Sequence, residues 1–156
     1  MASEGLEQLR ALALAHSRTL HPTLPESARS TRTYNDRTSN GCCLCIIDFL
    51  HFSGQQAERV SVTGRYIDKS KTVKDTLGFT RRIGSGQWIK SSMQPGTADL
   101  SATINGRSVK IEIKIGRDKQ SEFQKRYQQQ IEQAGGLYWL CHNFDEFLNY
   151  HNELIK

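Results

Sequence analysis

Two acidic residues and one lysine lie on either side of a predicted tight turn. Asp99 precedes one run of alternating residues, and the triplet Glu112-Ile113-Lys114 ends the next run. Mg²⁺ is a hard cation that binds oxygen ligands, and proteins usually hold it with one or two carboxylates while phosphate and water supply the other ligands. Two carboxylates with an amine beside them therefore suit a metal-assisted reaction on a phosphate group.

The turn between the two runs is Asn105-Gly106. This dipeptide predicts a β-hairpin, because a type I′ turn needs positive φ at both central residues. Strand pairing outward from such a loop places Asp99 directly opposite Glu112, and Lys114 returns to the same face of the hairpin. Like charges at directly opposed positions destabilise a sheet. We therefore expect a cation between the two carboxylates.

A second interpretation of the hairpin is a solvent-exposed element whose acids are balanced by Lys110 and Lys114, because a charged face is commonly only a solvated one. The predicted register argues against it, since such a hairpin would more naturally pair an acid with a base. In either interpretation, alternation gives the hairpin an apolar face. Its members are Leu100, Ala102, Val109, Ile111 and Ile113.

The wider frame, over residues 40–148, resembles the VRR-NUC branch of the PD-(D/E)xK nuclease superfamily. Ala98 stands where the family usually has proline. Residues 39–43 hold no acid, although such nucleases often carry a glutamate early in the first helix, and the nearest acids are Asp48 and Glu58. The residues that carry the resemblance are Gly96-Thr97-Ala98-Asp99-Leu100, Ile111-Glu112-Ile113-Lys114, Gln120-Ser121-Glu122-Phe123-Gln124 and Gly135-Gly136, with Ile47-Asp48-Phe49-Leu50 and Arg59-Val60-Ser61-Val62-Thr63-Gly64 upstream.

This resemblance implies an α/β fold, namely a restriction-endonuclease-like α/β/α sandwich with a central mixed β-sheet. It also implies a Mg²⁺-dependent DNA endonuclease that hydrolyses phosphodiester bonds, with junctions and branched DNA as candidate substrates and Mn²⁺ as a substitute metal. Asp99, Glu112 and the carbonyl of Ile113 would bind the metal. Lys114 would orient or deprotonate the attacking water, and Gln124 would face the active site. Stand-alone members of the branch look like homodimers, so a homodimer is expected.

Gln124 also has a local interpretation. The pattern Ser121-x-x-Gln124 fits a helix capping box, in which the glutamine side chain reaches back to the N–H of the serine. The capping and the active-site interpretations both remain open from the sequence.

The composition is that of a soluble globular protein with an excess of positive charge. The chain has 156 residues, a net charge of +5 and a pI of about 9.1, which suits a polyanionic partner such as DNA. No stretch approaches the ~20 apolar residues of a membrane span. Glu4 and Glu7 interrupt any N-terminal signal, so a cytoplasmic protein without membrane contact is expected. The spacing of the cysteines fits neither a zinc site nor disulfides between neighbours, which predicts buried free thiols at Cys42, Cys43, Cys45 and Cys141.

We expect two segments, an N-terminal helix with an extended arm in residues 1–38 and a nuclease domain in residues 39–156. In the first segment, the leucine spacing predicts a helix to about His16. The elements expected in the second segment are a helix over 39–52, strands over 57–63, 79–83 and 87–90, the hairpin, a helix over 121–134, a strand over 137–141 and a final helix capped by Asn143.

Basic residues that could follow DNA phosphates lie in two regions, between residues 65 and 95 and around the predicted helix over 121–134. Any single one of them is more often a solvated surface charge. The candidates for DNA binding are Arg65, Arg81, Arg82, Lys90, Lys119 and Lys125.

Other functions stay open from the sequence. The scattered histidines disfavour a histidine–metal nuclease. A non-catalytic DNA-binding or accessory protein that retains the nuclease fold is the alternative: the intact set of Asp99, Glu112 and Lys114 argues against it, and the missing helix glutamate argues for it. Cleavage of RNA in place of DNA stays open. The surfaces considered for a homodimer are the helix from Cys42 to Phe49, the N-terminal helix with Leu6, Leu9 and Leu12, and the final helix.

Overall fold

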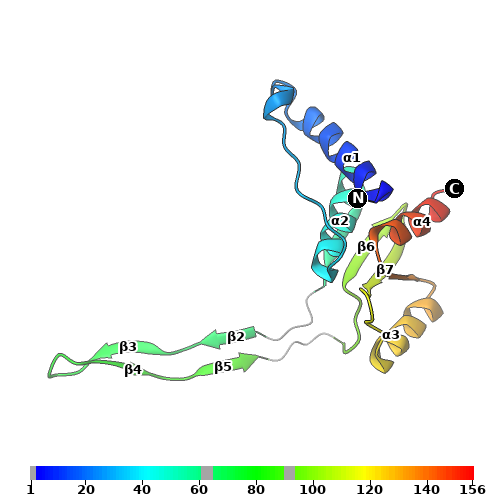
Figure 1. Cartoon of the computed structure of the whole chain (residues 1–156). Coiled ribbons are helices and arrows are strands. Elements are labelled where there is room, and N and C mark those ends of the chain that lie inside the picture. The colour runs from blue at the N-terminus through cyan, green and yellow to red at the C-terminus, as the bar shows by residue number, and fades with distance from the viewer. Residues whose placement is uncertain (1–2, 61–64, 90–93) are drawn as a thin grey trace. The chain divides into compact units, whose positions relative to one another are not determined.

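The computed structural model describes residues 3–60, 65–89 and 94–156 of the chain (Figure 1). The chain divides into two compact units, Met1–Val60 with Gly96–Lys156, and Ser61–Pro95. We call the first unit the core unit and the second the ribbon. This division differs from the expected boundary between residues 38 and 39, because the N-terminal helix packs into the hydrophobic core of the core unit.

A four-stranded mixed sheet forms the centre of the core unit. Its strands lie in the order β1–β6–β7–β8. β1 and β7 both pair antiparallel with β6, whereas β8 pairs parallel with β7, so the expectation of an α/β fold with a mixed sheet is confirmed. The strand bounds are Gln56–Arg59 for β1, Leu100–Ile104 for β6, Arg107–Ile113 for β7 and Leu137–Cys141 for β8.

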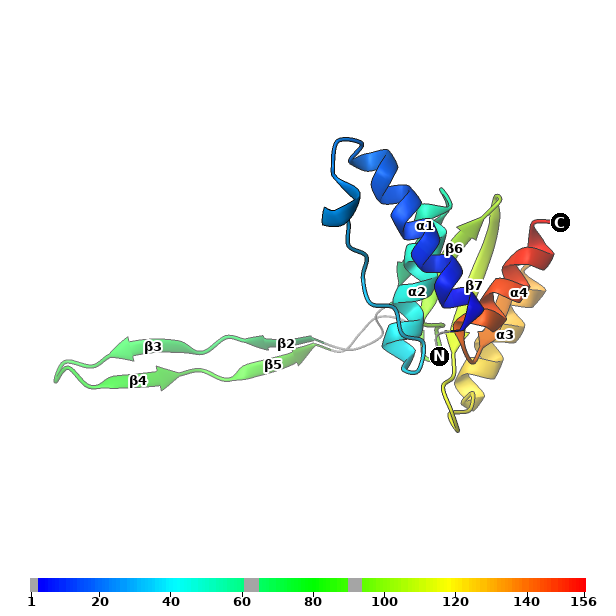
Figure 2. The same cartoon turned by 45° about the horizontal axis from the view of Figure 1, so that its top comes forward.

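Helices cover the apolar face of this sheet. α1 and α2 lie side by side and pack with α4, and the shared core includes Leu9, Ile46 and Phe147 (Figures 1 and 2). α3 buries none of its residues and contacts β8. No helix in the described part of the chain has the length and apolar character needed to cross a membrane. The helix bounds are Glu4–Leu20 for α1, Ser39–Phe52 for α2, Glu122–Gln133 for α3 and Phe144–Leu154 for α4.

The β6–β7 hairpin has the predicted register, since Leu100 pairs with Ile111. Asn105 and Gly106 have φ angles of 47° and 78°, the positive values that a type I′ turn needs. The predicted apolar face packs in the hydrophobic core. Its members, each at most 2% exposed, are Leu100, Ala102, Val109, Ile111 and Ile113.

The N-terminal segment is more structured than the sequence predicts. The leucine spacing predicts a helix that ends near His16, with an extended connection over residues 17–38. Instead, α1 continues to Leu20, and a short 3₁₀ helix, η1, spans Glu26–Ala28. The difference comes from a buried side chain downstream, that of Arg29, which is 3% exposed.

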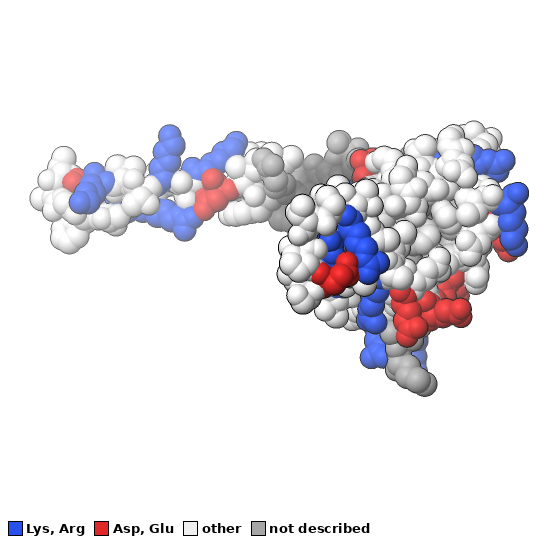
Figure 3. All heavy atoms as spheres, turned by 90° about the horizontal axis from the view of Figure 1, so that it is seen from above, with Lys and Arg blue, Asp and Glu red and all other residues white. Residues whose placement is uncertain are grey.

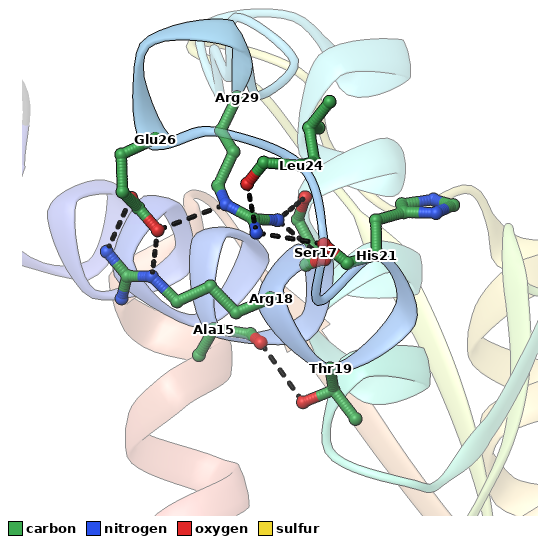
Figure 4. Close-up of polar contacts among 8 residues, drawn as sticks. All are labelled: Ala15, Ser17, Arg18, Thr19, His21, Leu24, Glu26 and Arg29. Carbon is green, nitrogen blue, oxygen red and sulfur yellow. Dashed lines mark hydrogen bonds and ion pairs between the residues drawn. The ribbon is translucent and has the colours of Figure 1, made fainter.

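The guanidinium of Arg29 binds the end of α1 (Figure 4). It donates hydrogen bonds of 2.9 Å to the carbonyls of Ser17 and His21 and one of 2.6 Å to the carbonyl of Leu24. It also forms an ion pair of 3.0 Å with Glu26. The last carbonyls of a helix have no donor within the helix. Arg29 adds a donor to one carbonyl of the last turn, that of Ser17, and donates to the carbonyls of His21 and Leu24 after the helix, which ties the connection between α1 and α2 to the end of α1.

The apolar faces considered for dimerisation are used within the chain. Leu6, Leu9 and Cys42 are at most 5% exposed and belong to the hydrophobic core, as does the inner face of α4. These residues cover their own sheet, and the homodimer itself stays a prediction. The four cysteines are free and buried, as predicted. Burial raises the pKa of the Cys43 and Cys45 thiols to about 11.

The ribbon consists of two short antiparallel ladders, β2 with β5 and β3 with β4. The strand candidates over 79–83 and 87–90 correspond to β4 and β5, whereas the sequence does not predict β2 and β3. Residues 61–63 of the strand expected over 57–63 lie outside the described residues, and so does Lys90. The bounds are Arg65–Asp68 for β2, Lys71–Lys74 for β3, Thr80–Ile83 for β4 and Gly86–Ile89 for β5.

Candidate active site

Asp99 lies directly before β6. Its carbonyl accepts a 2.8 Å hydrogen bond from the N–H of Val60, which extends the pairing of β1 with β6. Its Oδ2 accepts a 3.0 Å hydrogen bond from the N–H of Ile113 in β7. The carboxylate of Asp99 is therefore held beside the end of β7, in agreement with the register that sets it opposite Glu112.

Glu112 is a buried acid, 1% exposed, on the polar face of β7. Its Oε1 accepts a 2.9 Å hydrogen bond from Nζ of Lys114 and another from the side-chain amide of Gln124. Its Oε2 is buried and has no hydrogen-bond partner among the described residues. Leaving a buried polar atom without a partner is costly. One oxygen of Glu112 is therefore engaged in hydrogen bonds, and the other is an unsatisfied acceptor.

The electrostatics of Glu112 follow from this burial. Burial raises the pKa of Glu112 to about 7; the hydrogen bond from Lys114 opposes this rise, and the charge of Asp99 adds to it. A cation at the unsatisfied oxygen would favour the charged form of Glu112 and lower this pKa. The site therefore has a buried acceptor without a partner and an electrostatic preference for an added positive charge.

Lys114 carries the positive charge of the site and is 7% exposed. Its Nζ lies 2.9 Å from Oε1 of Glu112 and 3.3 Å from Oδ2 of Asp118. Burial alone would lower the pKa of Lys114, but the bonds to Glu112 and Asp118 outweigh it and raise the pKa, so the amine stays charged. Lys110, by contrast, donates a 2.6 Å hydrogen bond to Ser101. Among the described residues, Lys114 therefore forms ion pairs with acids of the hairpin and the following turn, whereas Lys110 bonds a serine.

Asp118 is part of this group, and no sequence pattern predicts it. The pairing of a lysine with an acid four residues later is a feature of helices, whereas residues 114–118 form a turn. The carboxylate is exposed, and the N–H of Lys119 also donates to it at 2.9 Å.

Gln124 forms the predicted capping box and also contacts Glu112 of the candidate site. Its Oε1 accepts a 2.9 Å hydrogen bond from the N–H of Ser121, and its own N–H donates to the hydroxyl of Ser121 at 3.3 Å, which completes the capping box. Its Nε2 donates to Glu112. The start of α3 is therefore tied to the buried carboxylate through a single amide group.

Gly96 allows the loop before Asp99 to approach α3 closely. It has a φ of +85°, and a Cβ at this position would lie 2.4 Å from the carbonyl carbon of Phe123 and 2.7 Å from the nitrogen of Gln124. Both the backbone conformation and the space therefore require glycine. The sequence offers Gly96 only as part of the family frame, because a glycine's close contacts leave no local pattern.

The donor set suits a hard cation that keeps several other ligands. Asp99 and Glu112 provide carboxylates, and the Ile113 carbonyl lies between Glu112 and Lys114 in the chain. Across the described residues, no three His, Cys, Asp or Glu side chains gather into a complete metal cage. Mg²⁺ does not need such a cage, because one or two carboxylates with phosphate and water are its usual ligands in proteins. The unsatisfied Oε2 of Glu112 fits this arrangement.

Of the acids nearest to the missing helix glutamate, Asp48 is engaged elsewhere, since it accepts hydrogen bonds of 3.0 Å from Arg32 and 3.1 Å from the hydroxyl of Tyr34. Glu58 is exposed on β1, and its pairing with Ser101 places it on the same face of the sheet as Glu112. In α2, the thiol of Cys43 lies within electrostatic range of the site. Burial raises its pKa, and the charge of Asp99 raises it further.

The candidate DNA-binding residues fall into two groups. In the core unit, Lys119 and Lys125 are exposed at the start of α3, and Lys125 pairs with Glu122 at 2.8 Å. In the ribbon, Arg81 and Arg82 are exposed. Lys90 lies outside the described residues, as does the side chain of Arg65.

Comparison of the chain with protein-family models, with curated proteins and with solved structures gives no match. The resemblance to the VRR-NUC branch thus depends on the residues and the geometry of this chain alone.

Proposed function

We propose that this chain is a Mg²⁺-dependent DNA endonuclease with a restriction-endonuclease-like core, similar to the VRR-NUC branch. The observation that carries the proposal is the buried, partnerless Oε2 of Glu112. It belongs to a carboxylate that lies next to Asp99 and is surrounded on its other oxygen by Lys114 and Gln124. A divalent cation would satisfy this oxygen and offset the repulsion between the two acids.

Asp99, Glu112 and the carbonyl of Ile113 would hold the cation. When bound, such a cation polarises a phosphodiester and lowers the pKa of a water molecule. Mg²⁺ is the proposed physiological metal, and Mn²⁺ would replace it because it accepts the same oxygen ligands.

Lys114 and Gln124 would act through charge and position. The amine of Lys114 is held charged between Glu112 and Asp118. A phosphate oxygen or an attacking water in the site would meet this charge, which stabilises the additional negative charge of the transition state. Gln124 would keep Oε1 of Glu112 in place, which leaves Oε2 for the metal.

One observation favours the alternative, a non-catalytic DNA-binding or accessory protein. Glu112 and Lys114 already form an ion pair at 2.9 Å, with side-chain exposures of 2% and 9%. A buried pair of this kind can be retained for structure alone. In that case the three residues would be a remnant of a nuclease site.

The experiment is a cleavage assay on supercoiled, linear, flapped and four-way DNA and on RNA, with Mg²⁺, Mn²⁺ or EDTA. The variants are Asp99→Asn and Glu112→Gln, which remove charge and keep shape. Glu153→Gln is the matched control, because Glu153 is an exposed acid of α4 and is not part of the proposed site. We expect wild type and Glu153→Gln to cut DNA with Mg²⁺ or Mn²⁺. The two site variants should lose at least about 10²-fold in rate and should still bind DNA in EDTA.

Full activity of Glu112→Gln, with contaminating nuclease excluded by a tagged, separately purified preparation, contradicts the proposed site. Binding without cleavage by the wild-type chain under every metal condition supports the accessory protein instead. Cleavage of RNA alone would keep the metal site and change the substrate.

A further inference from the structure

The two ladders of the ribbon follow one another in a common register. Moving three residues along each strand from the pair Asp68–Gly86 leads to the pair Lys71–Ile83. One side of the ribbon therefore extends from Arg65 in β2 to Lys74 in β3, with an interruption at Lys69 and Ser70. At ~3.3 Å per residue it spans ~30 Å, which is close to one helical turn of B-form DNA, ~34 Å.

The ribbon has no core of its own. None of the described residues from 66 to 89 is buried, and the side chains of β3 and β4 are exposed throughout. An isolated two-stranded element is marginally stable in water, and exposed apolar groups of this number indicate a binding surface. The large exposed apolar side chains are Tyr66, Val73, Leu77, Phe79, Ile83, Trp88 and Ile89, with exposed fractions from 45% to 80%.

The ribbon carries the net charge of the protein. The chain has 21 basic and 16 acidic residues, of which residues 61–95 hold seven and two, so this stretch carries +5 and the remainder, with 14 of each, is neutral. Both acids are occupied. Asp68 pairs with Arg82, and Asp75 accepts hydrogen bonds of 3.0 and 2.9 Å from the N–H groups of Leu77 and Phe79 in the turn.

The positive charges lie on both faces of the ribbon. Alternation places Lys74 and Arg82 on one face, and Lys71 and Arg81 on the other. Lysine and arginine side chains accordingly project from both sides in the space-filling view (Figure 3). Among the described residues, Lys71 and Lys74 form no ion pair. Two opposed positive faces suit a groove that has phosphates along both of its walls.

Tyr66 and Trp88 form an aromatic pair in the β2–β5 ladder, the ladder farther along the strands from the turn at Asp75 to Phe79. The ring of Tyr66 covers Gly86, where a Cβ would come within 1.9 Å of the ring, and lies 6.4 Å from the ring of Trp88. Tyr66 and Trp88 are 59% and 60% exposed. In a major groove, apolar side chains of this kind contact the methyl groups of thymine.

We infer that the ribbon is a DNA-binding arm that lies along the major groove of duplex DNA. A two-stranded β-ribbon fits the major groove, which is ~12 Å wide, and the charge of +5 is complementary to the phosphates on either side. A second copy of the chain is the other conceivable occupant. Two ribbons that each carry +5 repel each other, which argues against it. The inference rests on the proposed function only in taking the polyanion to be DNA.

The test measures binding of the full chain to a labelled duplex of about two helical turns, by fluorescence anisotropy in EDTA at increasing salt. The variant is Lys71→Ala with Lys74→Ala. The matched control is Arg107→Ala with Lys156→Ala, which removes the same charge from exposed positions of the core unit. We expect the ribbon variant to bind about tenfold or more weakly at ~0.1 M salt and to lose ~2 from the slope of log K against log salt. The control should match the wild type within about twofold.

Trp88 gives a second, direct measurement, because Trp139 is 6% exposed and contributes a buried signal. Duplex DNA should quench the emission of the wild type, and Trp88→Phe should remove the change. Equal losses in the ribbon and control variants overturn the inference, as does wild-type binding by the ribbon variant. A change of mass in light scattering caused by Lys71→Ala with Lys74→Ala would assign the ribbon to a second copy.

The two proposals fail separately. A chain that binds DNA through the ribbon and cuts no substrate contradicts the nuclease and retains the arm. A ribbon variant that binds and cuts as the wild type does contradicts the arm and retains the nuclease.

Discussion

The β6–β7 hairpin and the ribbon are both antiparallel strand pairs, but they differ in how much of their surface is buried. β6–β7 turns on Asn105-Gly106 and buries one face, whereas the ribbon turns through a loop from Asp75 to Phe79 and has no buried residue in β3 or β4. The difference is the second layer. β6–β7 has a strand on either side and helices on its apolar face, whereas each ladder of the ribbon has two strands only. Strand pairing alone does not make a core; packing against another layer does.

The charges of the two hairpins differ in the same way. Glu112 and Lys114 at the end of β7 are buried and paired, where charges act strongly at short range on a bound group. Lys71 and Lys74 in the ribbon are exposed, where charges attract a polyanion over a longer distance and are screened by salt. One hairpin is thus suited to chemistry and the other to recruitment.

The largest contrast is expected from one lysine in each hairpin. Lys114→Gln keeps a hydrogen-bond donor to Glu112 and removes the charge, so cleavage at saturating DNA should fall about 10²-fold or more, with affinity in EDTA nearly unchanged. Lys71→Ala should lower affinity severalfold and leave the rate at saturation unaltered. Single-turnover kinetics over a range of DNA concentrations separates the two. If Lys114→Gln changes affinity alone, Lys114 is a phosphate anchor.

A smaller contrast is expected from one isoleucine in each hairpin. Ile111 is 0% exposed and Ile83 is 60% exposed. Ile111→Ala removes buried apolar volume and should lower the free energy of unfolding by about 2–5 kcal/mol. Ile83→Ala should change it by less than ~0.5 kcal/mol. Urea denaturation followed by far-ultraviolet circular dichroism measures both, and a large loss in Ile83→Ala would mean that the ribbon contributes to the core.

The smallest contrast is expected from the turn glycines. Gly106 and Gly78 have φ angles of +78° and +84°, and a Cβ at either would meet no atom within 4 Å. Alanine therefore costs conformational energy alone, about 1–2 kcal/mol. Gly106→Ala should lower the melting temperature by a few degrees, whereas Gly78→Ala should leave it unchanged because it lies in a separate unit. Equal shifts in both thermal melts would show that the two units unfold together.

The core hairpin could be predicted because each of its signals is local. Asn105-Gly106 defines the turn, and strict alternation defines the buried face. The strands β2 and β3 escape prediction because single faces mix apolar and charged residues, as Tyr66 with Asp68 and Lys71 with Val73, so the alternation that marks a half-buried strand is missing. The extension of α1 escapes it because Arg29 acts from a distance in the sequence.

The candidate site divides in the same manner. The approach of Asp99 to Glu112 follows from the register of a hairpin and is predictable. The burial of Glu112, its pairing with Lys114 and the dual use of Gln124 depend on the way α3 is placed beside the sheet. Gly96 determines part of that placement, because its missing side chain lets the loop approach the backbone of Phe123. The periodicity of the sequence does not predict this contact.

The shared register of the ribbon also bears on how the core unit folds. β1 and β6 are neighbours in the sheet, yet 40 residues separate Arg59 from Leu100. Once β2 has paired with β5, only the five residues between β1 and β2 and the ten between β5 and β6 remain to be closed. The entropic free-energy cost of closing the loop between β1 and β6 then falls by about 1 kcal/mol. Pairing of β2 with β5 early in folding would therefore bring β1 to β6 faster and raise the folding rate of the core unit. The side chains of the ribbon would contribute to folding in this way although they stay exposed in the folded chain.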